Sequence, residues 1–379
     1  MRNISFVLAG ATGNLAALKL YPAISALKKE GSLKGQFKLI GVAHDNLTAE
    51  QFRAEVEEKT GGAFTDADYV RADFYHDTFD ELEKHVLPGS SVIFYLSTGA
   101  GFFLPILENI RNCKTINTDR VKIIIEKPYG KDYENTIMVN QYIEAHFKEN
   151  QIYRIDHYLG KEGMDALELV KKENHSRWNS DFIEEITFVL SEEAGIEERL
   201  DFYRETGAIA DIVQNHIFQM ILKVLTDSDY LRSSAIDSIN EAFRQGRASF
   251  YGKKYLPIEK ETMVYGTIIL TGEKWNNLKI KLLTGKRMKK KETEIRIKFK
   301  DSNQPVIVDF LQGNHDLPEY GKLIEDCTEG KHDSFITAEE AEGTWIFGNQ
   351  IRKEIEAKGE PELYKPDTVT TEDILDWIE

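Results

Sequence analysis

The stretch ISFVLAGATGNLA, residues 4–16, joins a strand-like apolar run to a glycine-containing turn and then to the start of a helical pattern. Small residues in such a turn let backbone N–H groups approach a pyrophosphate at a helix N-terminus. The glycine spacing is a variant of the dinucleotide fingerprint, and its place on the first strand favours a cofactor site over a plain glycine turn. The residues expected to contact the cofactor here are Gly10, Thr12, Gly13, Asn14 and Leu15.

The first part of the chain continues to alternate strand-like runs with helical patterns. Further strands are expected at residues 38–42, 91–95 and 121–125. Such alternation is typical of a parallel α/β sheet. We therefore predict a Rossmann-type NAD(P)-binding domain over residues 1–155.

The rhythm changes after about residue 180, where strand candidates follow one another. They lie at residues 185–190, 263–271, 278–283, 294–299 and 305–310. Helical patterns follow at 317–329 and 338–357, and the tail from Gly359, with Pro361 and Pro366, looks irregular. This order predicts an α+β domain over residues 156–379, built on a large, mainly antiparallel sheet.

Composition excludes several classes of protein. The 379 residues include 64 acidic and 48 basic side chains, a formal charge of -16 that disfavours binding to nucleic acid or to an anionic membrane. No apolar run approaches the roughly 20 residues of a bilayer span, and the start shows no cleavable signal, so we expect a cytoplasmic protein. Cys113 and Cys327 lie far apart and are expected to be ordinary buried thiols, with no disulfide and no metal site.

Two residues after the second expected strand bear on the choice of cofactor, His44 and Asp45. An acidic side chain at this place can accept hydrogen bonds from both adenosine ribose hydroxyls and repels a 2′-phosphate. Asp45 could instead be a loop residue before a helix, but Thr48 and Gln51 already offer a capping box there. Asp45 therefore favours NAD over NADP.

Two further segments are much more specific than the glycine turn: EKPYG at 126–130 and RIDHYLGKE at 154–162. With the glycine turn, QNH at 214–216 and GKR at 285–287, they resemble the glucose-6-phosphate dehydrogenase family in content and in order, over most of the chain. The resemblance implies an oxidoreductase of the pentose phosphate pathway. Its reaction would oxidise C1 of glucose 6-phosphate to 6-phosphogluconolactone, with hydride transfer to NAD or NADP.

The resemblance implies a catalytic pair, His216 and Asp156. Oxidising a hemiacetal to a lactone removes a proton from O1, which requires a base. His216 lies in an apolar-periodic helix, where a lone histidine is more often a satisfied core residue. In the family the equivalent histidine pairs with the aspartate equivalent to Asp156, which orients the ring and stabilises the imidazolium.

The resemblance also assigns the groups that bind the substrate. His157, Tyr158 and Lys161 provide an imidazole, a phenol and an ammonium for the phosphate, although a solvated polar loop would have the same composition. Lys127 is placed between sugar and nicotinamide, before Pro128, where family members commonly have a cis peptide bond. Glu192 and Asp211 would accept hydrogen bonds from ring hydroxyls. The basic run 286–291 could be a solvated edge, but family position directs Lys286 and Lys291 toward the substrate.

The chain departs from the family pattern at several places. His44 and Asp45 stand where the family usually has arginine for the 2′-phosphate, and the turn at Ser97, expected to contact the cofactor, lacks a common proline. Sheet strands are missing between about Phe310 and Leu317, so we expect no structural nucleotide. A homodimer through the remaining antiparallel sheet stays plausible. The family's glycine-rich C-terminal pattern is absent, which leaves the role of Tyr364 open.

Two other functions remain open at this point. A shortened member could act on another phosphorylated aldose, or on an amino sugar phosphate, in a specialised pathway. The chain could also be a non-catalytic sensor of nucleotide or sugar phosphate, but the retention of His216 and Asp156 argues against that function.

Overall fold

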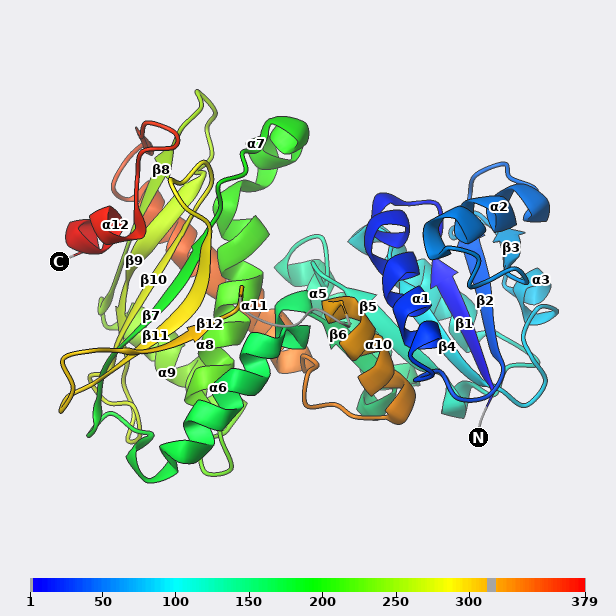
Figure 1. Cartoon of the computed structure of the whole chain (residues 1–379), viewed down its shortest axis with the longest axis horizontal. Helices are drawn as coiled ribbons and strands as arrows, with labels where there is room; N and C mark the ends of the chain where they lie inside the picture. Colours follow the sequence, from blue (N-terminus) through cyan, green and yellow to red (C-terminus); the bar gives the residue numbers. More distant parts are fainter. Residues whose placement is uncertain (1–2, 312–317, 379) are drawn as a thin grey trace. The chain divides into compact units, whose positions relative to one another are not determined.

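The computed structural model describes residues 3–311 and 318–378, which form two compact units (Figure 1). The first unit contains the described residues 3–160 and 318–341, and the second contains 161–311 and 342–378. The predicted boundary at 155/156 lies close to the first change of unit. Residues 318–341 differ from the prediction, because they pack with the first unit although the sequence pattern placed them in the second domain.

The first unit is built on six parallel strands in the order β3-β2-β1-β4-β5-β6. This is the strand order of a doubly wound dinucleotide-binding fold, so the predicted Rossmann-type domain is confirmed. The four strands expected from the sequence are present, and β3 and β6 are additional. The strands are β1 (Ile4–Ala9), β2 (Phe37–Ala43), β3 (Asp68–Arg71), β4 (Ser91–Leu96), β5 (Lys122–Glu126) and β6 (Ile152–Ile155).

Helices flank this sheet, and their ends follow local sequence signals. Thr48 and Gln51 form the capping box predicted for α2, and Gly61 ends that helix in the left-handed conformation, with φ of 61°. A short π-helix (Ala16–Leu20) precedes α1. The helices are α1 (Tyr21–Lys29), α2 (Ala49–Thr60), α3 (Asp80–Glu83), α4 (Phe103–Arg111), α5 (Tyr133–His146) and α10 (Glu319–Glu329).

Helix α10 belongs to the first unit because of its apolar face. Tyr320, Leu323, Ile324 and Cys327 recur at helical spacing, and all four are buried in the same core cluster as the strands β1 and β2. Figure 1 shows α10, in orange, beside α1, in blue. The hydrophobic period thus predicts a buried helix but does not say which core receives it.

The second unit contains a seven-stranded sheet in the order β12-β11-β7-β10-β9-β8-β13. Strand β10 is parallel to β7 and β13 is parallel to β8, while the other neighbours are antiparallel, as predicted for a mainly antiparallel sheet. Strands β8 and β13 are additional to the prediction. The strands are β7 (Ile183–Ser191), β8 (Ala248–Lys254), β9 (Met263–Ile269), β10 (Lys279–Gly285), β11 (Glu292–Phe299), β12 (Val306–Asp309) and β13 (Glu362–Leu363).

Helices α8 and α11 pack on each other, with the rings of Phe218 and Phe347 4.9 Å apart, and the π-helix η8 contacts β7 and β10. Helix α12 packs on β9 through Trp377 against Tyr265 (Figure 1). The helices are α6 (Glu162–Glu173), α7 (Leu200–Ala208), the π-helix η8 (Ile209–Ile217), α8 (Phe218–Leu225), α9 (Arg232–Arg244), α11 (Ala338–Glu356) and α12 (Thr371–Ile378). The first four residues of α11 are counted with the first unit.

The expectation of an irregular tail was wrong, because α12 forms there. Its start carries a capping box: the Thr370 hydroxyl accepts the Asp373 N–H at 3.1 Å, and the Asp373 carboxylate accepts the Thr370 N–H at 2.8 Å. Both prolines lie before this box, so they do not interrupt the helix.

Three other expectations concern single features. Both cysteines are free, and Cys327 is buried as expected, but Cys113 is only half-buried because it follows the exposed end of α4. Among the described residues, none of the helices has the length and apolar character needed to cross a membrane. The sequence predicts that family strands are missing between Phe310 and Leu317. This prediction concerns residues 312–317, which lie outside the described residues.

Candidate active site

The predicted cofactor residues lie at the carboxyl ends of β1 and β4, where the strand order of the first sheet reverses. Gly10 has φ of +82°, and a Cβ there would lie 2.7 Å from the Ser97 carbonyl oxygen, so only glycine fits. The Ser97 hydroxyl donates to the Ala9 carbonyl oxygen at 2.7 Å. The turns after β1 and β4 therefore pack against each other at the switch point, where open α/β sheets bind ligands.

Asp45 is connected to the glycine turn. The Thr12 hydroxyl donates to the Asp45 carboxylate at 2.5 Å, and the Tyr69 hydroxyl donates to the Asp45 carbonyl oxygen at 2.8 Å. The side chains of His44 and Asp45 are 85% and 42% exposed, so both can reach a ligand. The structure thus brings Thr12, His44 and Asp45 together at the edge of the sheet.

The EKPYG segment follows β5, and the Lys127–Pro128 peptide bond is cis, as the resemblance implied. Glu126 is buried and accepts a hydrogen bond from the Tyr95 hydroxyl of β4. Burial raises the pKa of Glu126 to about 7, although the Tyr95 hydrogen bond and the charge of Lys127 act in the opposite direction. A carboxyl group that titrates near neutrality therefore adjoins Lys127 at the carboxyl end of β5.

The RIDHYLGKE segment begins in β6, and its arginine has a structural role. Arg154 is 1% exposed, and its guanidinium binds Glu149 at 2.5 Å and Asn140 at 3.0 Å. Asp156, directly after β6, is fully buried, and its carboxylate accepts the Tyr158 backbone N–H at 3.0 Å. The segment therefore fixes the Asp156 side chain through the turn that follows it.

His157 and Tyr158 lie in the short helix η5 (His157–Gly160), which packs on α10. The imidazole of His157 stacks on the Tyr320 ring, with centroids 5.7 Å apart and planes inclined by 12°. A Cβ at Gly160 would lie 2.5 Å from the Glu319 carbonyl oxygen, so glycine allows this close approach. Tyr320 supports the predicted phosphate-binding imidazole, and no sequence signal identified it.

In the second unit, Asp211 and His216 lie on the π-helix η8, and both are buried, at 5% and 2% exposure. The Asn215 side chain donates to the Ala210 carbonyl oxygen at 2.7 Å within the same turn. π-Helical segments are rare and are frequent at functional sites, because the wider turn redirects side chains. The predicted base thus lies on an unusual helical segment of the second unit.

Three predicted substrate residues form one cluster in the second unit. The Lys286 ammonium lies 2.6 Å from the Glu192 carboxylate and 3.3 Å from that of Asp211. Two residues that sequence reasoning missed also bind Asp211: the Tyr203 hydroxyl donates to it at 2.6 Å, and the Arg199 guanidinium lies 3.0 Å away. Burial and the nearby Asp211 charge raise the pKa of Tyr203, so the phenol remains a donor.

The other predicted residues of the second unit are placed differently. Lys291 is exposed before β11 and lies outside the Lys286 cluster. Lys161, half-buried, directly precedes α6, and its carbonyl oxygen accepts the Met164 N–H at 2.9 Å.

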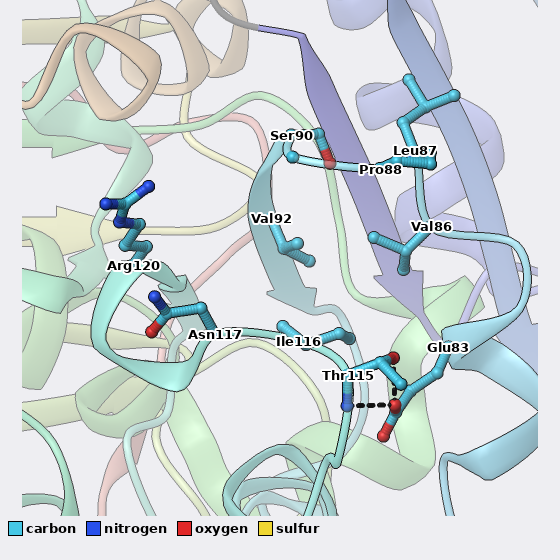
Figure 2. Close-up of a pocket in the computed structure, with 11 residues that line it drawn as sticks. Glu83, Val86, Leu87, Pro88, Ser90, Val92, Thr115, Ile116, Asn117 and Arg120 are labelled. Carbon is cyan, nitrogen blue, oxygen red and sulfur yellow. Dashed lines mark hydrogen bonds between the residues drawn. The ribbon is translucent and has the colours of Figure 1, made fainter.

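A cavity of about 460 Å³ lies elsewhere in the first unit, at the amino end of β4 (Figure 2). The Glu83 carboxylate in its wall accepts the N–H groups of Lys114 and Thr115, both at 2.6 Å. Ser90 and Val92, which line the cavity, lie at the start of β4. Gly10 and Ser97 instead follow the ends of β1 and β4. This cavity is therefore separate from the predicted cofactor site at the carboxyl ends of β1 and β4.

Comparison with known proteins agrees with this geometry. Residues 7–165 match the family model of the glucose-6-phosphate dehydrogenase NAD binding domain, and residues 170–238 match that of its C-terminal domain. The chain belongs to the glucose-6-phosphate dehydrogenase family. Glucose-6-phosphate 1-dehydrogenase of Helicobacter pylori strain J99 is 30% identical, with 92% of each chain covered.

Other relatives extend the agreement over most of the chain. Glucose-6-phosphate 1-dehydrogenase of Bacillus subtilis is 28% identical over 440 aligned positions, covering 91% of this chain and 90% of the relative. Since this chain has 379 residues, that alignment requires segments that the chain lacks. A glucose-6-phosphate dehydrogenase structure determined with glucose 6-phosphate has a TM-score of 0.84 at 20% identity, covering 100% of this chain and 97% of its own, which shows the shared fold.

Proposed function

We propose that the protein oxidises C1 of glucose 6-phosphate to 6-phosphogluconolactone with NAD or NADP as hydride acceptor. The observation that carries the proposal is the cluster of Glu192, Asp211 and Lys286 in the same unit as the η8 helix that holds His216, in a chain of this family. The relatives named above carry the activity in their names.

The residues divide the chemistry between them. His216 removes the proton from O1, and Asp156 orients its ring, as the family pattern implies. As O1 forms a double bond to C1, the C1 hydrogen leaves with its electron pair. A bound dinucleotide would supply the nicotinamide that accepts this hydride. His216 therefore takes up one proton for each hydride that leaves C1.

Substrate binding rests on charge and hydrogen bonding. Glu192 and Asp211 accept hydrogen bonds from ring hydroxyls, and Lys286, whose single ammonium pairs with both carboxylates, holds them in place. His157, Tyr158 and Lys161 bind the phosphate, while Lys127 lies toward the nicotinamide and Lys291 contributes positive charge at the rim; these roles come from the family resemblance.

The predicted cofactor site, at the carboxyl ends of β1, β2 and β4, fits a dinucleotide. Gly10 keeps the turn free of a Cβ, and the Thr98 hydroxyl oxygen beside it is buried without a hydrogen-bond partner among the described residues. We infer that NAD is preferred, because the Asp45 carboxylate places negative charge where a 2′-phosphate would bind. A hydrogen bond from the Thr12 hydroxyl holds this carboxylate beside the glycine turn. Gly13, Asn14, Leu15, His44 and Ser97 complete the proposed cofactor contacts.

The decisive test is cofactor reduction, followed by absorbance, with purified protein and saturating NAD or NADP. We expect turnover of glucose 6-phosphate, with much weaker turnover of free glucose, because the phosphate supplies binding energy. Turnover of galactose 6-phosphate or glucosamine 6-phosphate in its place would transfer the activity to another sugar phosphate. Calorimetric binding of glucose 6-phosphate without any cofactor reduction would indicate a sensor.

The cofactor preference has its own test, Asp45→Asn. Removing the charge, and with it the charge-assisted hydrogen bonds to ribose, should change the ratio of kcat/KM for NAD to that for NADP by about 10- to 100-fold toward NADP. The matched control is Asp119→Asn, an exposed aspartate of the same unit, which should leave the ratio unchanged. A wild-type preference for NADP, or an unchanged ratio in the Asp45 variant, would refute the role of Asp45.

We also propose that the protein forms a homodimer through the second sheet. The support is apolar exposure on that sheet: Tyr251 of β8 and Ile307 of β12 are 41% and 53% exposed. Light scattering should then give about twice the chain mass of 43.4 kDa.

A further inference from the structure

The turn between β10 and β11, which carries Lys286, is bound along its backbone by the C-terminal tail. The Tyr364 hydroxyl donates to the Lys286 carbonyl oxygen, the Asp367 N–H donates to the Arg287 carbonyl oxygen at 2.7 Å, and the Lys289 N–H donates to the Val369 carbonyl oxygen at 3.0 Å. All of these residues lie in the second unit. The tail thus holds successive residues of the turn.

The hydrogen bond from Tyr364 has a determined direction. Since a carbonyl oxygen can only accept a hydrogen bond, the Tyr364 hydroxyl must be the donor in its contact with the Lys286 carbonyl oxygen. The Thr262 hydroxyl, 3.1 Å from the Tyr364 oxygen, therefore donates to it, and the Thr262 oxygen accepts the Tyr255 N–H at 3.2 Å. Tyr364 is 7% exposed, and burial raises its pKa, so the phenol keeps its proton. With its donor and acceptor engaged, this hydroxyl acts on the turn itself.

A second contact joins unusual backbone conformations. Arg287 and Asp367 have φ of 50° and 62°, a left-handed region that non-glycine residues adopt mainly where the surroundings require it. The Arg287 guanidinium binds the Asp367 carboxylate through two N–H donors, at 2.8 and 2.5 Å. Such bidentate pairs fix orientation as well as distance. The turn and the tail therefore hold each other's conformation.

The same turn is bound from the substrate side. The Lys286 N–H donates to the Thr262 carbonyl oxygen at 3.0 Å, and the Met288 N–H donates to the Glu192 carbonyl oxygen at 2.9 Å. The Lys286 side chain is only 6% exposed and reaches Glu192 and Asp211. Because a packed interior leaves a buried side chain little freedom, a shift of the turn would displace the ammonium from both carboxylates.

We propose that Tyr364 and Asp367 are positioning residues that keep Lys286 in place for binding of the sugar phosphate. The C-terminal tail is then part of the substrate site without touching the substrate. The inference rests on the proposed function, since Lys286 binds glucose 6-phosphate only if that sugar phosphate is the substrate.

The test is Tyr364→Phe, which keeps the ring and removes the hydroxyl. We expect KM for glucose 6-phosphate to rise about three- to tenfold, the worth of one hydrogen bond. The kcat and the KM for NAD should stay unchanged, because the turn that carries Lys286 takes part neither in hydride transfer nor in the predicted cofactor site. Thr262→Val, which removes the donor to Tyr364, should raise the same KM in the same direction. General loss of structure would instead lower the active fraction for both substrates.

The matched control is Tyr230→Phe, a tyrosine of the same unit whose hydroxyl donates to the Ser234 carbonyl oxygen at 3.0 Å, away from the turn and the tail, and it should leave every constant unchanged. Asp367→Asn tests the second contact, since asparagine tolerates a positive φ but loses the charge; it should also raise KM for glucose 6-phosphate. If the wild type turns over glucose 6-phosphate but Tyr364→Phe has an unchanged KM, the inference alone is overturned. If the wild type fails to turn it over, the proposed function falls first and the inference falls with it.

Discussion

Replacing His216 with asparagine is expected to lower kcat for glucose 6-phosphate by about 10²- to 10⁴-fold, the usual contribution of a positioned general base. Asparagine retains hydrogen-bonding capacity at this buried position on η8, but it cannot take the O1 proton at neutral pH. Binding should persist, because the cluster of Glu192, Asp211 and Lys286 is unchanged. The measurements are steady-state cofactor reduction and calorimetric binding of the sugar phosphate.

The control for this prediction is His175→Asn, an exposed histidine of the same unit, which should retain full kcat. Circular dichroism and the unfolding midpoint must match the wild type before kcat is compared, since His216 is only 2% exposed. Full activity of His216→Asn would remove His216 from the chemistry, and loss of sugar phosphate binding would assign it a binding role.

The Rossmann-type unit could be predicted because its signals are local. The run from Ile4 into Gly10 contains both the strand and the turn, and Gly10 is required by its φ and by its contact with Ser97. Strands β3 and β6 were missed for a local reason as well. Each has four residues, too few to display a period, and β3 carries charged residues at both ends.

The membership of α10 could not be predicted, because an apolar face at helical spacing says that a helix is buried but not where. Leu323 and Cys327 would satisfy either core equally well on composition. Their burial against the first sheet depends on contacts with residues distant in sequence, such as Leu8 and Tyr95 of the same core cluster, which no local residue pattern specifies.

The candidate site shows the same division. Glu192, Asp211 and Lys286 were selected by family motifs, and the structure places the Lys286 ammonium 2.6 Å from the Glu192 carboxylate and 3.3 Å from that of Asp211. Tyr364 was not selected for a role, because its contact with Lys286 joins residues 78 positions apart. Tyr203 lies only eight residues before Asp211, but the non-helical Gly207 stands between them, so no helical period predicts their contact. Resemblance thus identifies groups that contact a ligand more readily than the residues that hold those groups in place.

Gly207→Ala is expected to lower the free energy of unfolding by about 2–4 kcal/mol, from backbone strain together with a steric clash. Gly207 has φ of 66° and ψ of -175°, a region that is essentially restricted to glycine. A Cβ there would lie 2.4 Å from a carboxylate oxygen of Glu261. That carboxylate accepts the Ile209 N–H at 3.0 Å, at the start of the helix that carries His216, so the variant should lower kcat as well as stability.

The comparison that isolates this contact is Gly246→Ala. Gly246 also has a positive φ, of +65°, but no atom lies within 4 Å of a Cβ at that position, so alanine should cost only about 1–2 kcal/mol. Urea unfolding of both variants gives the difference, and kcat measured well below each unfolding midpoint separates stability from catalysis. Since burial raises the pKa of Glu261, displacing it from the Ile209 N–H should favour its protonation further and weaken the cap of η8. Equal losses of stability in the two variants, with kcat unchanged in both, would mean that the contact with Glu261 does not position the helix that carries His216.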